Sequence, residues 1–228
     1  MLYHSTRGLN DSKSFSEVLH SGLAGDGGLF VPESIPILNM ETINEWRQHS
    51  YEELAVEIIS LFTGECFSRS ELTKIVNQSY SGFQGELKSP LIKLEENHYL
   101  LELFHGPTLA FKDFAMQVIA KMFSNTLQKK KSEINIVTAT SGDTGSAAVE
   151  AFKNASNVNL YVLYPHERIS QMQRMQMTTS NAKNIKVFAV RGTFDDCQSI
   201  VKQLFADKKL VSDVNLSGVN SINWARIL

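Results

Sequence analysis

The sequence predicts an α/β fold: a Rossmann-like parallel sheet flanked by helices, preceded by a mixed, largely helical N-terminal region. The main observation is that short apolar runs alternate with helical patterns through the second half of the chain. Strands at this spacing, joined by helices, are typical of βαβ units with right-handed crossovers. A second observation is a glycine-containing turn that leads directly from one such run into a helix. The apolar runs are residues 98–103, 134–139, 159–164, 185–190 and 213–217.

The overall composition is that of a globular protein. Its 228 residues include 22 Lys plus Arg and 24 Asp plus Glu, which gives a formal charge of −2, and 43% are hydrophobic. Because nucleic acids and anionic membranes usually select a basic excess, neither is expected as the main partner. No segment approaches the roughly 18 apolar residues of a membrane-spanning helix, and no apolar leader follows Met1. We therefore expect a cytoplasmic protein.

The cysteines and histidines show no metal-binding pattern. Cys66 and Cys197 lie far apart and outside any CxxC motif, and the six histidines form no HExxH or HxH spacing. We therefore expect no disulfide framework, no metal ion and two buried thiols.

The N-terminal region, residues 1–95, is expected to contain three helices. Ser70 is a plausible start signal for the third of them. Residues 81–89 contain two glycines and few aliphatic side chains, so they are the best candidate for a boundary. An α/β lobe is expected over residues 96–228. The predicted helices are residues 42–48, 51–62 and 70–80.

The helix expected after residues 105–108 is amphipathic. At about 100° per residue, Lys112 lies at the edge of the apolar stripe and can reach an interior cleft. Asp113 points nearly opposite the centre of the stripe. A single lysine is usually solvated, so this position alone assigns it no function. The stripe consists of Phe111, Phe114, Ala115, Val118, Ile119, Met122 and Phe123.

The turn after residues 134–139 is a candidate anion site. Strand, glycine turn and helix follow one another, so backbone N–H groups and the positive end of the helix dipole point to one place. The hydroxyl groups of Thr140, Ser141 and Thr144 add hydrogen-bond donors. The anion would be a phosphate or a carboxylate. The alternative is an ordinary strand-to-helix turn that needs only glycine and a cap.

Two nucleotide motifs do not fit this turn. The spacing Gly142-x-x-Gly145-x-x-Ala148 lacks the first Gly-x-Gly of the dinucleotide fingerprint, and the Gly-Lys-Ser/Thr of a P-loop is missing. Glu167, which follows the next predicted strand, could imitate the ribose-binding acid of an NAD enzyme. An NAD-binding fold is nevertheless the weakest alternative.

A second candidate anion site lies near the C-terminus. Asn220 and Ser221 place short polar side chains at the start of a predicted helix, and Arg226 follows about one turn later. Arginine is the preferred partner for bidentate phosphate recognition. Taken alone, these residues indicate only a capped helix with an exposed arginine.

Taken together, the ordered motifs resemble the threonine synthase family, a group of pyridoxal-phosphate enzymes whose wider fold family includes the tryptophan synthase β subunit. The resemblance implies the type II fold of pyridoxal-phosphate enzymes. It runs along nearly the whole chain, through residues 22–33, 103–114, 140–148, 176–179, 192–197 and 220–226.

The resemblance implies a cofactor and roles for two residues around it. Lys112 would hold pyridoxal 5'-phosphate as a Schiff base and act as the catalytic residue. Asp143 would lie near the 3-hydroxyl group of the cofactor, where many relatives have asparagine.

The resemblance also implies a substrate and the residues that bind it. The implied reaction converts O-phospho-L-homoserine and water into L-threonine and phosphate. Thr140, Ser141 and Thr144 would bind the carboxylate of this substrate, and its phosphate would lie against Asn220, Ser221 and Arg226. Two alternatives stay open: a phosphate-eliminating paralogue that gives an α-keto acid, and a non-catalytic binding module.

Three departures from the family pattern stand out. Glu167 occupies a position that is often glycine, Gln171 occupies one that is often proline, and both are expected on a loop. Family members are also about twice as long, and this chain stops at Leu228 without a helix stop signal. We therefore expect a truncated amino-terminal portion that retains the cofactor weakly and is inactive or nearly so. Exposed apolar surface would favour self-association.

Overall fold

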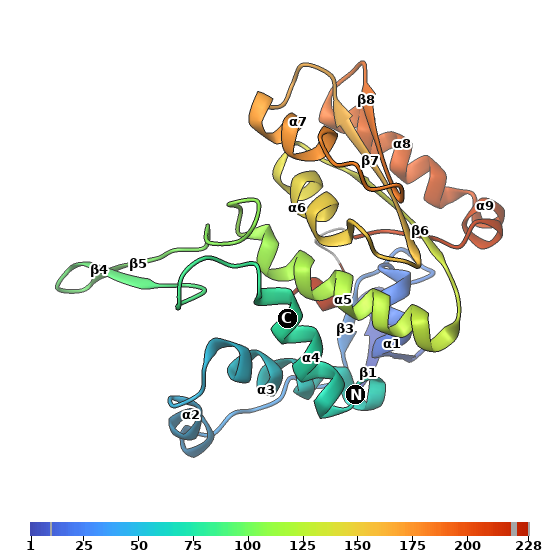
Figure 1. Cartoon of the computed structure of the whole chain (residues 1–228). Helices are drawn as coiled ribbons and strands as arrows, with labels where there is room; N and C mark the ends of the chain where they lie inside the picture. Colours follow the sequence, from blue (N-terminus) through green and yellow to red (C-terminus); the bar gives the residue numbers. More distant parts are fainter. Residues whose placement is uncertain (10, 220–222, 228) are drawn as a thin grey trace.

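The computed structural model describes residues 1–9, 11–219 and 223–227. Figure 1 shows a long helix, α5 (Lys112–Lys130), that crosses the molecule between the N-terminal region and a parallel sheet. A two-stranded hairpin projects away from the rest of the chain on the left of this view. The two candidate anion sites, at residues 140–144 and 220–226, lie far apart in the sequence. Their distance in space therefore depends on how the N-terminal region, α5 and the parallel sheet pack together.

The N-terminal region is mixed, as predicted, but it also contains strands that the sequence pattern did not reveal. Its antiparallel sheet has the order β2-β1-β3, with β1 (Leu2–Ser5), β2 (Lys13–Ser14) and β3 (Phe30–Pro32). Strands of two to four residues are too short to show a clear alternation of apolar and polar side chains. The helices are α1 (Phe15–Ser21), α2 (Met40–Trp46), α3 (Tyr51–Thr63) and α4 (Arg69–Tyr80), with a 3₁₀ turn at Gly64–Cys66.

Helices α3 and α4 begin at capping boxes. The hydroxyl of Ser50 accepts the backbone N–H of Glu53, and the Glu53 carboxylate accepts from Ser50 in return. Ser68 and Glu71 form the same arrangement at α4. Each box satisfies N–H groups that the first helical turn leaves unpaired. The cap of α4 is therefore Ser68, and the expected start signal at Ser70 was wrong by two residues.

The four-stranded parallel sheet confirms the predicted α/β lobe. Its strand order is β8-β7-β6-β9, and all three neighbouring pairs are parallel. Strands β6 and β8 have the predicted bounds, β7 is one residue longer at each end, and β9 keeps only the last two residues of its predicted run. The strands are β6 (Ile134–Ala139), β7 (Val158–Pro165), β8 (Ile185–Val190) and β9 (Leu216–Ser217).

The run at residues 98–103 does not belong to this sheet, which corrects the prediction. Strand β5 (His98–Leu101) pairs antiparallel with β4 (Leu91–Glu95) in a separate hairpin, and every residue of both strands is exposed. The reason is proximity: two strands joined by a tight turn pair with each other, whereas a parallel partner needs a long crossover.

Helices cover both faces of the parallel sheet. In Figure 1, α6 (Asp143–Phe152) and α7 (Gln171–Thr178) lie on one side, together with α5, and α8 (Phe194–Ala206) lies on the other. The short helix α9 (Lys208–Asp213) leads from α8 to β9. Because the strands are parallel, their carboxyl ends lie at one edge, and the turn from β6 to α6 is at that edge.

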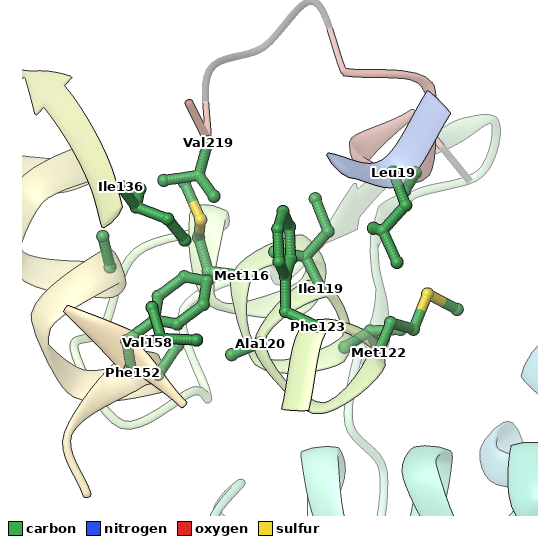
Figure 2. Packing of buried hydrophobic residues seen from close by; sticks show 14 of the residues in the cluster. Leu19, Met116, Ile119, Ala120, Met122, Phe123, Ile136, Phe152, Val158 and Val219 are labelled. Carbon is green, nitrogen blue, oxygen red and sulfur yellow. The ribbon is translucent and has the colours of Figure 1, made fainter. Parts of the chain in front are cut away.

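One hydrophobic core joins the N-terminal region to the lobe through α5. Met116, Ile119 and Phe123 on this helix are fully buried, and the same cluster includes Tyr3 from β1 and Ile136 from β6. Figure 2 shows these α5 side chains in a continuous packing with others from both regions. The proposed division at residue 95 therefore does not separate two hydrophobic cores.

The predicted C-terminal helix needs correction within the described residues. Trp224–Arg226 forms a single 3₁₀ turn, in which the side-chain oxygen of Asn223 accepts the N–H of Ala225. A buried asparagine that caps one turn satisfies the backbone locally without a longer helix. Asn220 and Ser221, which were expected to start the helix, lie outside the described residues.

Further expectations concern thiols, metals and membranes. Cys197 is buried, but Cys66 is only half-buried, so the expectation of two buried thiols was wrong for Cys66. Within the part of the chain that the structure describes, no three His, Cys, Asp or Glu side chains cluster as metal ligands. Among the same residues, no helix is both long and apolar enough to cross a membrane.

Candidate functional site

A folded loop sets the position at which α5 begins. The carboxylate of Asp113 accepts hydrogen bonds from the backbone N–H of Thr108 at 2.8 Å and from its hydroxyl at 2.7 Å. Gly106 packs so closely that a Cβ there would lie 2.5 Å from the Asp113 carboxylate. Asp113 is completely buried, and desolvation raises its pKa. Lys112, the first residue of α5, is thereby fixed next to this loop.

The burial of Asp113 corrects the sequence-based view that its side chain faces away from the interior. Most of the predicted stripe is at least partly buried, but Phe111 is 57% exposed, which corrects the prediction for that residue. The loop at 106–108 folds back over the start of α5 and covers the opposite face. A helical wheel describes one helix by itself, so it cannot show what covers the first turn.

The side-chain amine of Lys112 lies beside Asp143, at the start of α6. Its Nζ atom is 3.7 Å from Oδ2 of Asp143 and 4.3 Å from the ring centroid of Phe111. The Lys112 side chain is 20% exposed and that of Asp143 is 47% exposed. The amine therefore lies at the wall of an interior space rather than in open solvent, next to the predicted anion-binding turn.

The turn from β6 to α6 has the backbone that an anion site needs. Gly142 adopts a φ of 139°, which side-chain-bearing residues rarely reach. The buried Thr140 accepts the N–H groups of Gly142 and Gly145 at 2.9 and 2.8 Å, so its hydroxyl oxygen holds the turn together. The first-turn amides of Asp143 and Thr144 have no intrahelical acceptor by geometry. They mark the place where an anion would bind.

The three hydroxyl-bearing residues of this turn differ in their surroundings. Thr140 is buried with its oxygen engaged inside the turn, Ser141 is exposed and Thr144 is half-buried. Of the three predicted carboxylate-binding residues, Ser141 and Thr144 are thus the ones that a ligand can approach from solvent. Thr140 contributes mainly by shaping the backbone.

Sequence reasoning missed Gln173, which contacts Asp143 from α7. The Nε2 atom of Gln173 donates to Oδ1 of Asp143 at 2.6 Å. Gln173 is also the N3 residue of the capping box whose N-cap is Ser170. The pattern Ser-x-x-Gln was visible in the sequence and marks a helix start. Its contact with α6 is visible only in three dimensions.

A cavity of about 440 Å³ adjoins Lys112. Helices α3, α4 and α5 and the 3₁₀ turn at Trp224–Arg226 form its walls, which are mainly apolar. Lys112 is part of its lining, whereas Asp143 is not. The lining includes Tyr51, Leu54, Phe111, Lys112, Phe114 and Arg226.

Arg226 lies on the wall of the same cavity as Lys112. Its guanidinium donates a 3.5 Å hydrogen bond to the backbone oxygen of Val219, and burial lowers its pKa. Among the described residues, no carboxylate lies within 4 Å of this guanidinium. A half-buried cation without a protein anion is suited to an anionic ligand.

Two departures from the family pattern, at Glu167 and Gln171, have local structural explanations. Glu167 has a φ of 59°, the left-handed conformation that glycine adopts most easily. Gln171 is the first residue of α7 rather than part of a loop, which corrects the expectation for that position. Proline is well suited to a first helical position because its φ matches and no N–H is lost there.

Fold and site together define a class of protein: an α/β domain whose lysine amine lies beside a glycine-containing strand-to-helix turn at the carboxyl edge of a parallel sheet. The chain belongs to the pyridoxal-phosphate dependent enzyme family, whose model matches residues 83–226. A second model, described as the threonine synthase N terminus, matches residues 2–80. The junction between the two matches, at residues 81–82, lies within the glycine-containing segment 81–89.

Within that family, the chain corresponds to the amino-terminal portion of threonine synthases. It is 45% identical to a threonine synthase from Pseudomonas aeruginosa, covering all of this chain and 49% of the relative. It is 42% identical to threonine synthase-like 2 from Rattus norvegicus, of which it covers 47%. A structure of PLP-bound threonine synthase from Brucella melitensis matches with a TM-score of 0.94 and 44% identity, over 100% of this chain and 49% of the other. The chain spans about half the length of these relatives.

Proposed function

We propose that this chain forms part of a pyridoxal-phosphate enzyme that converts O-phospho-L-homoserine and water into L-threonine and phosphate. The observation that carries the proposal is the position of the Lys112 amine, 3.7 Å from Asp143 and next to the α6 turn. The match to the threonine synthases over the whole chain supports the reaction class.

The residues present fit the amine-reactive end of the cofactor. Lys112 supplies a primary amine whose side chain is largely shielded, and it stands on the edge of a mainly apolar cavity. Asp143 supplies a polar group within reach of the same place. When bound, pyridoxal phosphate supplies an electron sink for the charge that develops at the substrate Cα. Lys112 would hold it, and Asp143 would contact its 3-hydroxyl group.

The remaining site residues suit the two anionic groups of the substrate. The backbone turn with Ser141 and Thr144 would bind the carboxylate at the α6 N-terminus, where the helix dipole favours negative charge. Arg226 would bind the phosphate, orient this leaving group at Cγ and stabilise its developing charge. Asn220 and Ser221 are proposed for the same phosphate and lie outside the described residues.

Lys112 would also move protons during the reaction. A displaced amine at this position could take protons from the substrate Cα and Cβ and return protons to Cγ and Cα, because it lies on the cavity wall beside the turn. Removal of the Cβ proton would supply the electron pair that expels the phosphate. Phosphate would leave from Cγ, and water would add at Cβ. The cavity walls from α3 and α5 are apolar, which limits competing reactions with bulk water.

The test is chemical trapping of Lys112. The purified chain is incubated with pyridoxal phosphate, reduced with borohydride and mapped by mass spectrometry. We expect the modification at Lys112 in the parent and its loss at that position in Lys112→Arg. Lys121→Arg, a matched change on the same helix, should leave the labelling at Lys112 intact. Labelling spread evenly over the lysines would contradict the proposal.

A second candidate function is phosphate elimination that yields an α-keto acid instead of threonine. The identity to threonine synthase-like 2 is 42%, close to the 45% identity to a threonine synthase, so sequence identity does not separate the two reactions. Product analysis with a chain of the length of these relatives separates the two, because only one reaction yields threonine. We expect the 228 residues alone to retain the cofactor weakly and to show little activity. Self-association also stays a prediction.

A further inference from the structure

Helix α7 holds Gln173 directly against the start of α6. A Cβ on Gly142 would lie 2.3 Å from the Gln173 side-chain amide, so the two segments are in van der Waals contact. The hydroxyl of Ser146, one turn into α6, donates to the backbone oxygen of Gln173 at 3.3 Å. Both the main chain and the side chain of Gln173 are therefore fixed relative to the turn.

The hydrogen bonds of Gln173 define which way its amide points. Its Oε1 atom accepts from the backbone N–H and the hydroxyl of Ser170, at 3.2 and 3.0 Å. The other end, Nε2, therefore faces Oδ1 of Asp143, at 2.6 Å. The opposite orientation would give up the bond from the Ser170 N–H and place two acceptors against each other. Because Nε2 only donates, Oδ1 is the acceptor in this bond.

Resting on the proposed role of Lys112, we propose that Gln173 is a positioning residue that holds the Asp143 carboxyl group with Oδ1 as its acceptor and Oδ2 facing Lys112. With Oδ1 engaged by Gln173, Oδ2 is the atom left 3.7 Å from the Lys112 amine. The Asp143 side chain is 47% exposed, so without this bond it would be free to rotate into solvent. Gln173 touches neither the amine nor the cavity.

The test follows the carboxyl group of Asp143 without cofactor. Its ¹³Cγ signal, assigned with Asp143→Asn, is titrated between about pH 3 and 8 in the parent and in variants. Gln173→Glu keeps the capping-box acceptor for Ser170 but removes the donor and adds a negative charge. We expect the Asp143 signal of this variant to titrate at higher pH than that of the parent. Gln173→Leu should move the titration in the same direction by less, because only the donor is lost.

The matched control is Gln176→Glu, which makes the same change of charge one turn further along α7. Gln176 donates to the backbone oxygen of Thr108 rather than to Asp143, so the Asp143 titration should stay in place. An unchanged titration in both Gln173 variants would overturn the proposal. A displacement of the Asp143 titration in Gln173→Glu alone would also overturn it, because this would show only repulsion between two carboxylates. An equal displacement in Gln176→Glu would overturn it as well.

The outcome is independent of the proposed function. Borohydride trapping at Lys112 reports on cofactor binding, whereas the Asp143 signal is read in the cofactor-free chain. Trapping at Lys112 with an unmoved Asp143 signal would leave the function standing and remove the role of Gln173. A displaced Asp143 signal without trapping at Lys112 would establish the contact between Gln173 and Asp143. It would also remove the reason to regard this contact as part of a cofactor site.

Discussion

The side chain of Gln173 lies over the backbone of Gly142, so closely that no Cβ fits between them. The φ of Gly142, 139°, lies in a region that disfavours other residues as well. The turn after β6 therefore depends on glycine at position 142 and on helix α7, which packs against it. The predictions that follow begin with this contact.

Gly142→Ala should destabilise the fold and disturb the Lys112 site. A Cβ would meet the Gln173 amide at 2.3 Å and would require a strained φ, which costs about 1–3 kcal/mol before any displacement of α7. The free energy of unfolding in urea measures this. Gly82→Ala is the control, because a Cβ there meets nothing within 4 Å. Equal stability of the two variants would contradict the expected role of the contact.

His20 should make stability depend on acid pH. Burial lowers the pKa of His20 from 6.5 to about 4, with the nearby Lys130 as a smaller cause. Its ring faces Thr126 and Phe123 of α5. Because the folded pKa lies below the unfolded one, the unfolded chain binds the proton more readily. Stability from the neutral ring is complete above about pH 6.5 and is lost as pH falls towards 4, by about 2–3 kcal/mol.

The measurement is the free energy of unfolding between about pH 7 and 4 for the parent and for His20→Gln. The variant should lose less stability over this window, because glutamine does not titrate. His98→Gln, on the exposed β5 strand, is the matched control and should follow the parent. A variant curve parallel to that of the parent would show that His20 does not cause the acid dependence.

Phe123→Ala should weaken the N-terminal region and the lobe together. Phe123 is fully buried in the cluster that contains both Tyr3 and Ile136, and removal of such a ring costs about 3–5 kcal/mol. Amide hydrogen exchange should show faster exchange in both β1 and β6. Faster exchange confined to one of these strands would indicate that the two regions do not share the cluster of which Figure 2 shows a part.

Ser68→Ala should destabilise α4 by about 1 kcal/mol, because this hydroxyl accepts the N–H of Glu71. Ser70→Ala, a control two residues further on, should change stability by less than about 0.5 kcal/mol. Chemical denaturation of both variants separates the two positions. A larger loss at Ser70 would favour the helix start that the sequence alone suggested.

The sequence by itself determined the elements whose signals are local. The strand-turn-helix at 134–148 follows from an apolar run, a glycine and a helical stripe, and β6 has the predicted bounds. The existence of α5 and the candidate lysine were also visible, because a 19-residue amphipathic helix averages its pattern over many positions. The family resemblance added residue roles that no periodicity contains.

Only the tertiary structure decided what lies next to what. Three features depend on contacts between segments that the local sequence patterns do not predict. They are the burial of Asp113, the hairpin pairing of β5 and the contact of Gln173 with Asp143. The last of these joins residues 30 positions apart through one hydrogen bond. The local sequence pattern reflects which conformation a segment favours by itself. Contacts between distant residues depend instead on how separate segments pack together.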